Sequence, residues 1–256
     1  MKNTNQNKTK AIIIANTKTY ITTLKSFYAL QNKIWSKLEK DNYVYMCAVP
    51  SSLVSSIAKE SYRAMVVGAQ SFEALDNGAH TGQNTLENII EAGARFVIVG
   101  HSEERTVLED DNRINEKVVK SISKNFTTVL CVGEKSRNAE QDYTEQIKIQ
   151  IIKDLKNIDK SNISKLIIAY EPLWAIGAAK AATPVEAQEA IIIIRRTLVD
   201  VFGIDNAKKI KVIYGGSVDH DNARKFITDA TADGVLVGRA CMDAGKFAGI
   251  VNSLLN

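Results

Sequence analysis

Short apolar segments alternate with stretches of helical periodicity along most of the chain. Eight segments have the composition of buried strands, at residues 11–15, 43–48, 64–68, 96–100, 127–132, 166–170, 211–214 and 234–237. Such continuous apolar runs are typical of parallel sheets that are buried on both faces. Between the first two, residues 22–38 place apolar side chains about every 3.6 positions, as an amphipathic helix does. A later helix is predicted to begin at Thr183, which suits the N-cap, with Pro184 in its first turn.

This rhythm predicts an α/β fold, a closed (β/α)₈ barrel that forms a single domain over residues 11–256. Eight strand–helix units in roughly 250 residues match the usual size of such a barrel. A doubly wound open sheet is the main alternative. To bind a dinucleotide it would need a glycine fingerprint after its first strand, and residues 14–18 contain no glycine. Residues 1–10 have nothing apolar after Met1, so we expect a disordered tail that is not a signal peptide.

Composition and charge exclude several classes of function. The chain has 45% hydrophobic residues and a net charge of +4, and its lysines are scattered, which argues against a nucleic-acid partner. Its aliphatic runs are too short to span a bilayer, so no membrane partner is expected. Neither the three cysteines nor the three histidines have the spacing of a metal site or a disulfide framework. A reducing cytoplasm is therefore the expected compartment.

Polar residues directly follow many of the predicted strands. They are Asn16 and Lys18, His101 to Glu103, Glu171, Gly215 to Ser217, and Gly238. Because active sites of such barrels are built at the carboxyl ends of the strands, these residues are predicted to share one site. Glu171 is the most informative of them, since Pro172 ends its strand and the apolar residues 173–177 follow. That segment is too apolar for an ordinary surface loop and is expected to cover something. The alternative is a solvated acid at a strand end.

Several motifs together resemble the triosephosphate isomerase family. They are GHSE at residues 100–103, AYEPLWAIG at 169–177, YGGSV at 214–218 and LVG at 236–238, together with Asn16 and Lys18. The resemblance covers nearly the whole chain after the tail. It implies an aldose–ketose isomerase that interconverts dihydroxyacetone phosphate and glyceraldehyde 3-phosphate in glycolysis and gluconeogenesis. It also implies that no metal or organic cofactor takes part.

The same resemblance assigns roles to individual residues. Glu171 corresponds to the catalytic base, and His101 to a neutral imidazole that donates to the substrate carbonyl. Lys18 corresponds to a cation beside the developing enediolate, Asn16 to an amide donor, and Glu103 to a partner that holds Lys18. Backbone N–H groups at Gly177, Ser217, Gly238 and Arg239 are expected to bind the phosphate. Residues 172–182 correspond to a lid.

The resemblance further implies a homodimer, in which Thr81 reaches the partner subunit's site. Gln83 stands where the family usually has an acid, and Glu104 where it usually has an arginine, so an expected charge pairing near the interface is absent. Other departures are Thr17, Thr19 and Tyr20 in the first motif, Ala178 and Ala179 in the lid, and Arg239 in place of a second glycine.

Two alternative functions remain open from the sequence. An isomerase of four-carbon sugar phosphates could use the same residues, and the motifs do not separate the two substrates. A catalytically weak barrel retained as a scaffold is a different class. The intact set of Asn16, Lys18, His101 and Glu171 argues against a scaffold.

Overall fold

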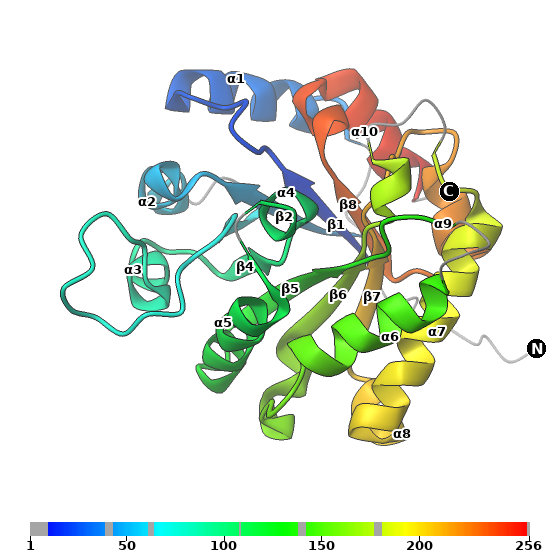
Figure 1. Cartoon of the computed structure of the whole chain (residues 1–256). Helices are drawn as coiled ribbons and strands as arrows, with labels where there is room; N and C mark the ends of the chain where they lie inside the picture. The colour runs from blue at the N-terminus through cyan, green and yellow to red at the C-terminus, as the bar shows by residue number, and fades with distance from the viewer. Residues whose placement is uncertain are drawn as a thin grey trace, which may run out of the picture.

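Eight parallel strands close into a barrel in a computed structural model of the chain (Figure 1). The structure describes residues 10–38, 43–60, 64–107, 109–137, 142–176 and 181–254. Each strand pairs with its neighbour in the chain, and β1 also pairs with β8, which closes the sheet and confirms the predicted barrel. The strands are β1 (Ala11–Asn16), β2 (Tyr43–Val49), β3 (Val66–Ala69), β4 (Phe96–Val99), β5 (Thr127–Val132), β6 (Leu166–Tyr170), β7 (Lys211–Tyr214) and β8 (Gly234–Val237).

Helices follow the strands and surround the barrel (Figure 1). The α-helices are α1 (Leu24–Trp35), α2 (Ser51–Lys59), α3 (Leu86–Glu91), α4 (Ser102–Arg105), α5 (Asp111–Ser123), α6 (Tyr143–Asp154), α7 (Pro184–Phe202), α8 (Ile204–Ala207), α9 (Ala223–Thr228) and α10 (Ala244–Ser253). Short 3-10 helices are η1 (Lys160–Lys165), η2 (Leu173–Ala175) and η3 (Arg239–Met242). No described helix is long and apolar enough to cross a bilayer.

The predicted helix start at Thr183 is confirmed in detail. The Thr183 hydroxyl accepts a hydrogen bond from the backbone N–H of Glu186, and the Glu186 carboxylate accepts one from the N–H of Thr183. This reciprocal capping box satisfies two donors that a helix N-terminus otherwise leaves unpaired. Pro184 occupies the first helical position, where no N–H is needed.

The bounds of β5 to β8 are as predicted, β1 and β2 each extend one residue further, and larger or more informative differences occur at β3 and β4. β3 begins at Val66, two residues later than predicted. β4 ends at Val99, because Gly100 has a φ of +69°, a left-handed backbone that turns the chain out of the strand. That turn leads directly into His101. The predicted tail falls, apart from Lys10, outside the described residues and stays a prediction.

Apolar side chains form two layers of core, one inside the barrel and one between the barrel and its helices. Along β4, Phe96 and Ile98 belong to the inner layer, whereas Val97 and Val99 belong to the outer one. All four are fully buried, as expected for a strand covered on both faces. Gly68 makes room for the Phe96 ring, since a Cβ at residue 68 would lie 2.3 Å from it.

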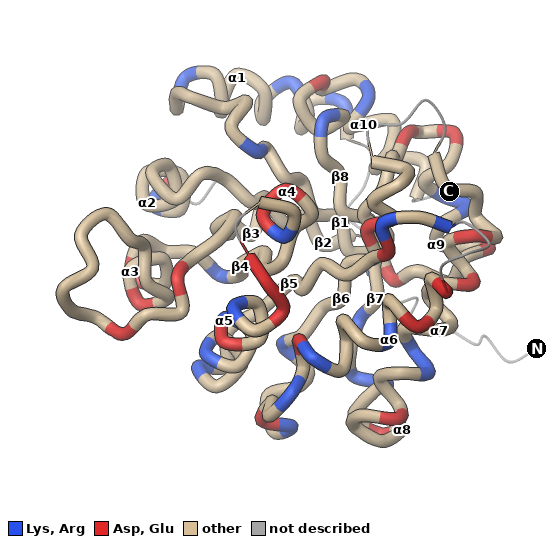
Figure 2. The backbone as a smooth tube through the Cα atoms, in the orientation of Figure 1, with Lys and Arg blue, Asp and Glu red and all other residues tan. Residues whose placement is uncertain are grey.

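Charged residues are dispersed over the outer helices. In Figure 2, Lys and Arg segments alternate with Asp and Glu segments around the chain and do not gather into a stripe. This arrangement is consistent with the absence of a nucleic-acid partner, which stays a prediction.

Candidate functional site

A cavity of about 660 Å³ opens at the carboxyl ends of the strands. It is lined by the eight predicted site residues that the structure places together: Asn16, Lys18, His101, Glu103, Glu171, Ser217, Gly238 and Arg239. Thr81 does not line it, and Gly177 lies outside the described residues. The barrel thus brings residues from five of its strand ends to one place, as the sequence predicted.

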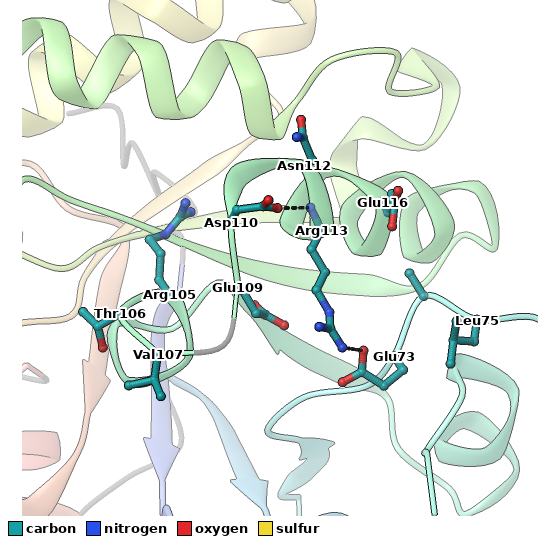
Figure 3. Close-up of a pocket in the computed structure, with 11 residues that line it drawn as sticks. Glu73, Leu75, Arg105, Thr106, Val107, Glu109, Asp110, Asn112, Arg113 and Glu116 are labelled. Carbon is teal, nitrogen blue, oxygen red and sulfur yellow. Dashed lines mark hydrogen bonds and ion pairs between the residues drawn. The ribbon is translucent and has the colours of Figure 1, made fainter. Parts of the chain in front are cut away.

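A second cavity, of about 750 Å³, lies between the segment after β3 and the start of α5 (Figure 3). None of the predicted site residues lines it. Two of its charged side chains, Arg113 and Glu73, pair with each other at 2.6 Å, and the backbone N–H of Arg113 donates to the carboxylate of Asp110. The smaller cavity is the better candidate site, because it holds the acid, the imidazole and the cation that the chemistry needs.

Glu171 follows β6 and is only 2% exposed. Its backbone N–H donates to the carbonyl of Val132 at 2.8 Å, which continues the sheet one residue beyond the strand. Its carboxylate Oε2 accepts a hydrogen bond from the backbone N–H of Ser102 at 3.0 Å, and Oε1 lies 3.5 Å from His101 Nε2. The acid is therefore buried and held at two points, unlike a solvated strand end.

His101 lies at the N-terminus of α4, with its Nδ1 accepting a hydrogen bond from the backbone N–H of Glu103 at 3.2 Å. An accepting Nδ1 carries no proton, so the neutral ring holds its proton on Nε2. That Nε2–H faces the cavity next to the Glu171 carboxylate. The arrangement places an Nε2 donor in the cavity, and its action on a substrate carbonyl stays a prediction.

Lys18 has a left-handed backbone with a φ of +47°, which is uncommon for a residue other than glycine. Its N–H donates to Asn16 Oδ1 at 3.0 Å, and its carbonyl accepts from Gln70 Nε2 at 2.9 Å. Its ammonium pairs with Glu103 at 2.7 Å, as predicted. Because the Asn16 oxygen is used in this way, its amide nitrogen is the group available to a ligand.

Thr17 provides the support for this loop at a position where the family usually has Trp. It is 1% exposed, and its hydroxyl donates to the carbonyl of Ala48 at the end of β2. Gln70 Nε2 lies 3.3 Å from the same hydroxyl, so the first motif is fixed by hydrogen bonds to two neighbouring strand ends. In this chain the loop that carries Lys18 is thus supported by side-chain hydrogen bonds.

Glycines allow close approach at the far side of the cavity, after β7. A Cβ at Gly215 would lie 2.9 Å from Glu171 Cγ, and one at Gly216 would lie 2.2 Å from the Tyr214 hydroxyl. Ser217 follows, and its hydroxyl donates to the carbonyl of Ala175 at 3.0 Å. This bond ties the segment after β7 to the segment that follows Glu171.

Arg239 follows Gly238 at the end of β8 and begins η3. Arg239 is not one of the described residues with a positive φ, so its backbone conformation is one that a residue with a side chain adopts without strain. Gly238 packs against Lys18, since a Cβ at that position would lie 3.6 Å from Lys18 Cε. The second glycine common in the family is thus not required by the backbone of this chain.

Sequence reasoning missed Glu134, two residues after β5. Its side chain is fully buried and accepts hydrogen bonds from Arg137 Nε, the Tyr170 hydroxyl and Trp174 Nε1, at 2.7, 2.9 and 2.9 Å. The Glu134 carbonyl also accepts from the N–H of Leu173. Burial and the charge of Glu134 hold the pKa of Tyr170 well above its usual range. The carboxylate anchors η2, and its place after a strand was the signal that identified the other site residues.

Other cavity residues were also missed: Tyr20, Asp219, Asp243 and Lys246. Asp243 caps α10 by accepting from the N–H groups of Gly245 and Lys246, and the Lys246 hydrogen bond is the largest cause of its lowered pKa. These residues lie on loops and helix starts beyond the strand ends, where the sequence gives no clear positional signal.

The cysteines and potential metal ligands contribute no reactive centre in the described part of the chain. Cys47, Cys131 and Cys241 are buried and free, and burial raises the pKa of Cys241 to about 12. No group of three or more His, Cys, Asp or Glu side chains in the described ranges is placed to hold a metal ion.

Comparisons with known proteins agree with this geometry. The family model described as triosephosphate isomerase matches residues 11–254. A triosephosphate isomerase of Mycoplasmoides gallisepticum is 36% identical over 252 residues, which cover 96% of this chain and 99% of the relative. Those of Clostridium novyi and Alkaliphilus oremlandii are 39% and 33% identical, over 73% and 87% of this chain and 75% and 91% of the relatives. The chain therefore belongs to the triosephosphate isomerase family.

Proposed function

We propose that the protein interconverts dihydroxyacetone phosphate and D-glyceraldehyde 3-phosphate. The observation that carries this proposal is the pairing of a buried carboxylate, Glu171, with the Nε2–H of a neutral imidazole, His101, 3.5 Å away. Lys18 lines the same cavity. An acid–base pair beside a cation is what proton transfer next to a carbonyl requires.

The reaction follows from these three groups. The Glu171 carboxylate removes a proton from the carbon beside the carbonyl, and the electron pair moves onto the carbonyl oxygen to form an enediolate. His101 Nε2–H donates to that oxygen and transfers protons between the two oxygens, while the Lys18 ammonium stabilises the negative charge. Protonated Glu171 then returns its proton to the neighbouring carbon. The product is an isomer, so no electrons leave the substrate.

In this proposal the phosphate binds on the side of the cavity opposite His101 and Glu171. The backbone N–H groups of Ser217, Gly238 and Arg239 follow the last two strands, where barrels of this class commonly bind phosphate. Backbone donors suit this role because they are fixed in place before the ligand arrives. Gly177 has the same role in the proposal, although it lies outside the described residues.

Residues 172–182 act as a lid over the site in this proposal. Their described first part, η2, is held to the barrel by the hydrogen bond from Trp174 to Glu134. Closing apolar residues over Glu171 would exclude water and strengthen the carboxylate as a base. The cytoplasm is the proposed compartment, which fits three cysteines that are all free.

A homodimer is the proposed assembly. Residues 76–84, including Thr81 and Gln83, are all exposed, and the segment before α3 projects from the barrel (Figure 1). An exposed projecting loop suits insertion into a second copy. Glu104 is half-buried, and burial raises its pKa against an opposing hydrogen bond with Ser71, while the charge of Glu109 adds to the rise. Sedimentation at micromolar protein should show a dimer, and a monomer alone would overturn this assembly.

A coupled assay with three-carbon and four-carbon sugar phosphates tests the proposed reaction. We expect turnover of the triose phosphates and a loss of about 10²- to 10⁴-fold in kcat for Glu171→Gln, which removes the base. Glu91→Gln, at the exposed end of α3, is the matched control and should keep full activity. Near-normal turnover of folded Glu171→Gln would refute the base assignment. Preference for the tetrose phosphates would refute the substrate.

A further inference from the structure

Two exposed cations line the site beyond the strand ends. Arg239 begins η3 and Lys246 lies in the first turn of α10, and both line the same cavity as Ser217 and Gly238. Among the described residues, neither side chain has a carboxylate within ion-pair distance. The third cation of the cavity, Lys18, is different, because Glu103 already pairs with it at 2.7 Å. Arg239 and Lys246 are therefore the cations of the cavity that are available to an anion.

The charge balance of the cavity makes these two cations important. Its described lining carries three cations, Lys18, Arg239 and Lys246. It also carries four carboxylates, those of Glu103, Glu171, Asp219 and Asp243. A phosphate ester adds up to two further negative charges. Without Arg239 and Lys246, the dianion would enter a cavity whose remaining cation is already shared with Glu103.

The two carboxylates at this end are occupied by backbone donors. Asp219 Oδ1 accepts from the N–H groups of Asp221 and Asn222, and Asp243 Oδ1 accepts from those of Gly245 and Lys246. Such N–H bonds fix the carboxylates against the backbone and compensate part of their charge. Within the described ranges, the guanidinium of Arg239 and the ammonium of Lys246 make no side-chain hydrogen bond, although the charge of Lys246 contributes to the lowered pKa of Asp243.

We propose that the side chains of Arg239 and Lys246 bind the substrate phosphate and make the site selective for a doubly charged phosphate ester. This inference rests on the proposed function, and it adds two side chains to the backbone N–H groups at Ser217, Gly238 and Arg239. A guanidinium presents several N–H donors whose fork matches phosphate oxygens. Lys246 adds a second charge from another element.

The kinetic signature of this role is a fall in kcat/KM together with weaker binding of inorganic phosphate. The phosphate takes no part in bond making or breaking, but binding energy from such a remote group can stabilise the transition state as well as the bound substrate, so the loss divides between kcat and KM. Losing one charge-assisted hydrogen bond weakens binding by about tenfold or more. We therefore expect Arg239→Gln and Lys246→Gln each to lower kcat/KM roughly tenfold and to raise the inhibition constant of phosphate by a similar factor.

The experiment compares wild type, the two single variants and the double variant in the coupled assay, from low to high ionic strength. Inorganic phosphate serves as the second probe, through its inhibition constant and its heat of binding. The dependence of kcat/KM on ionic strength should weaken in the double variant, because screening acts on charges that it lacks. Lys208→Gln is the matched control. It removes the same charge from an exposed position of the segment leading into β7, at the opposite end of the barrel.

The outcomes separate the two proposals. An inactive wild-type enzyme would overturn the proposed function, whereas phosphate calorimetry would still report on the two cations. An active wild type with unchanged kcat/KM and unchanged phosphate binding in the double variant would overturn this inference alone. Equal changes in Lys208→Gln would also overturn it, because the effect would then come from net charge. A fall in kcat/KM with unchanged phosphate binding would overturn it as well, because the side chains would then act on a part of the substrate other than its phosphate.

Discussion

Gly133 is the position at which a single methyl group would most directly disturb the base. It follows β5, and a Cβ built there would lie 1.9 Å from the carbonyl oxygen of Glu171 and 2.6 Å from its carbonyl carbon. Cβ atoms essentially never approach other heavy atoms within 3.0 Å. Gly133→Ala therefore requires Glu171 or the end of β5 to move by roughly 1 Å or more, since packed backbone cannot accept the overlap.

The surroundings leave little room for Gly133 itself to move. Its N–H and carbonyl both bond to the side chain of Gln150, at 2.9 and 3.0 Å. A misplacement of about 1 Å in a catalytic group costs roughly 10²-fold in rate, and 10²-fold corresponds to about 2.7 kcal/mol of activation free energy. The same overpacking should lower the free energy of unfolding by about 1–3 kcal/mol.

Measuring kcat in the coupled assay, together with thermal unfolding, tests both numbers. Gly249→Ala is the matched control, because a Cβ there would lie 3.4 Å from His220, an ordinary contact, inside α10. That variant should keep wild-type kcat and gain about 0.5–1 kcal/mol of stability from the helix preference for Ala. A folded Gly133→Ala enzyme with kcat within twofold of wild type would refute the argument.

Two buried charges give further predictions. Lys117→Met should lower the free energy of unfolding by about 3–5 kcal/mol. Lys117 is only 1% exposed, and its loss leaves the charge of its buried partner Glu109 uncompensated. An unchanged midpoint of urea unfolding would contradict this prediction. Burial raises the pKa of Asp154 from 3.8 to about 6, against the opposing charge of Arg105. At a pH between those two values, Asp154 keeps its proton in the folded state but has lost it in the unfolded chain. The contribution of this carboxyl to the free energy of unfolding therefore falls as the pH rises from about 4 to about 6. The stability of Asp154→Asn relative to wild type should therefore increase across that window, and a flat difference would refute the shift.

The barrel and the strand-end residues of the site could be predicted because their causes are local. An apolar run of four to six residues, followed by a polar residue, reports both the strand and the place where it leaves the barrel. The shift of β3 shows the limit of this reasoning. Ala64 and Met65 are apolar and would fit a buried strand. The pairing between β2 and β3 nevertheless begins at Met46 and Val66, and this register decides where β3 starts.

The rest of the site depends on contacts between segments far apart in the chain. Glu134 gains its role from Tyr170 and Trp174, which are about as distant in the sequence as two neighbouring barrel units. Lys246 lies on α10, which packs against α1 from the other end of the chain. Neither role can be read from the local hydrophobicity pattern. A lysine or a glutamate counts there as a polar residue, whether its side chain is exposed or buried in the fold.

The left-handed backbone of Lys18 sets folding against catalysis at one residue. Its φ of +47° costs about 1–2 kcal/mol relative to an ordinary conformation, and the hydrogen bonds from Lys18 to Asn16 and from Gln70 to Lys18 hold it there. Glycine would adopt the same backbone without strain but would bring no ammonium group. Stability alone would thus favour glycine at this position, whereas the proposed reaction requires the cation of Lys18. Variants stabilised by random mutagenesis should be screened for turnover first at this loop.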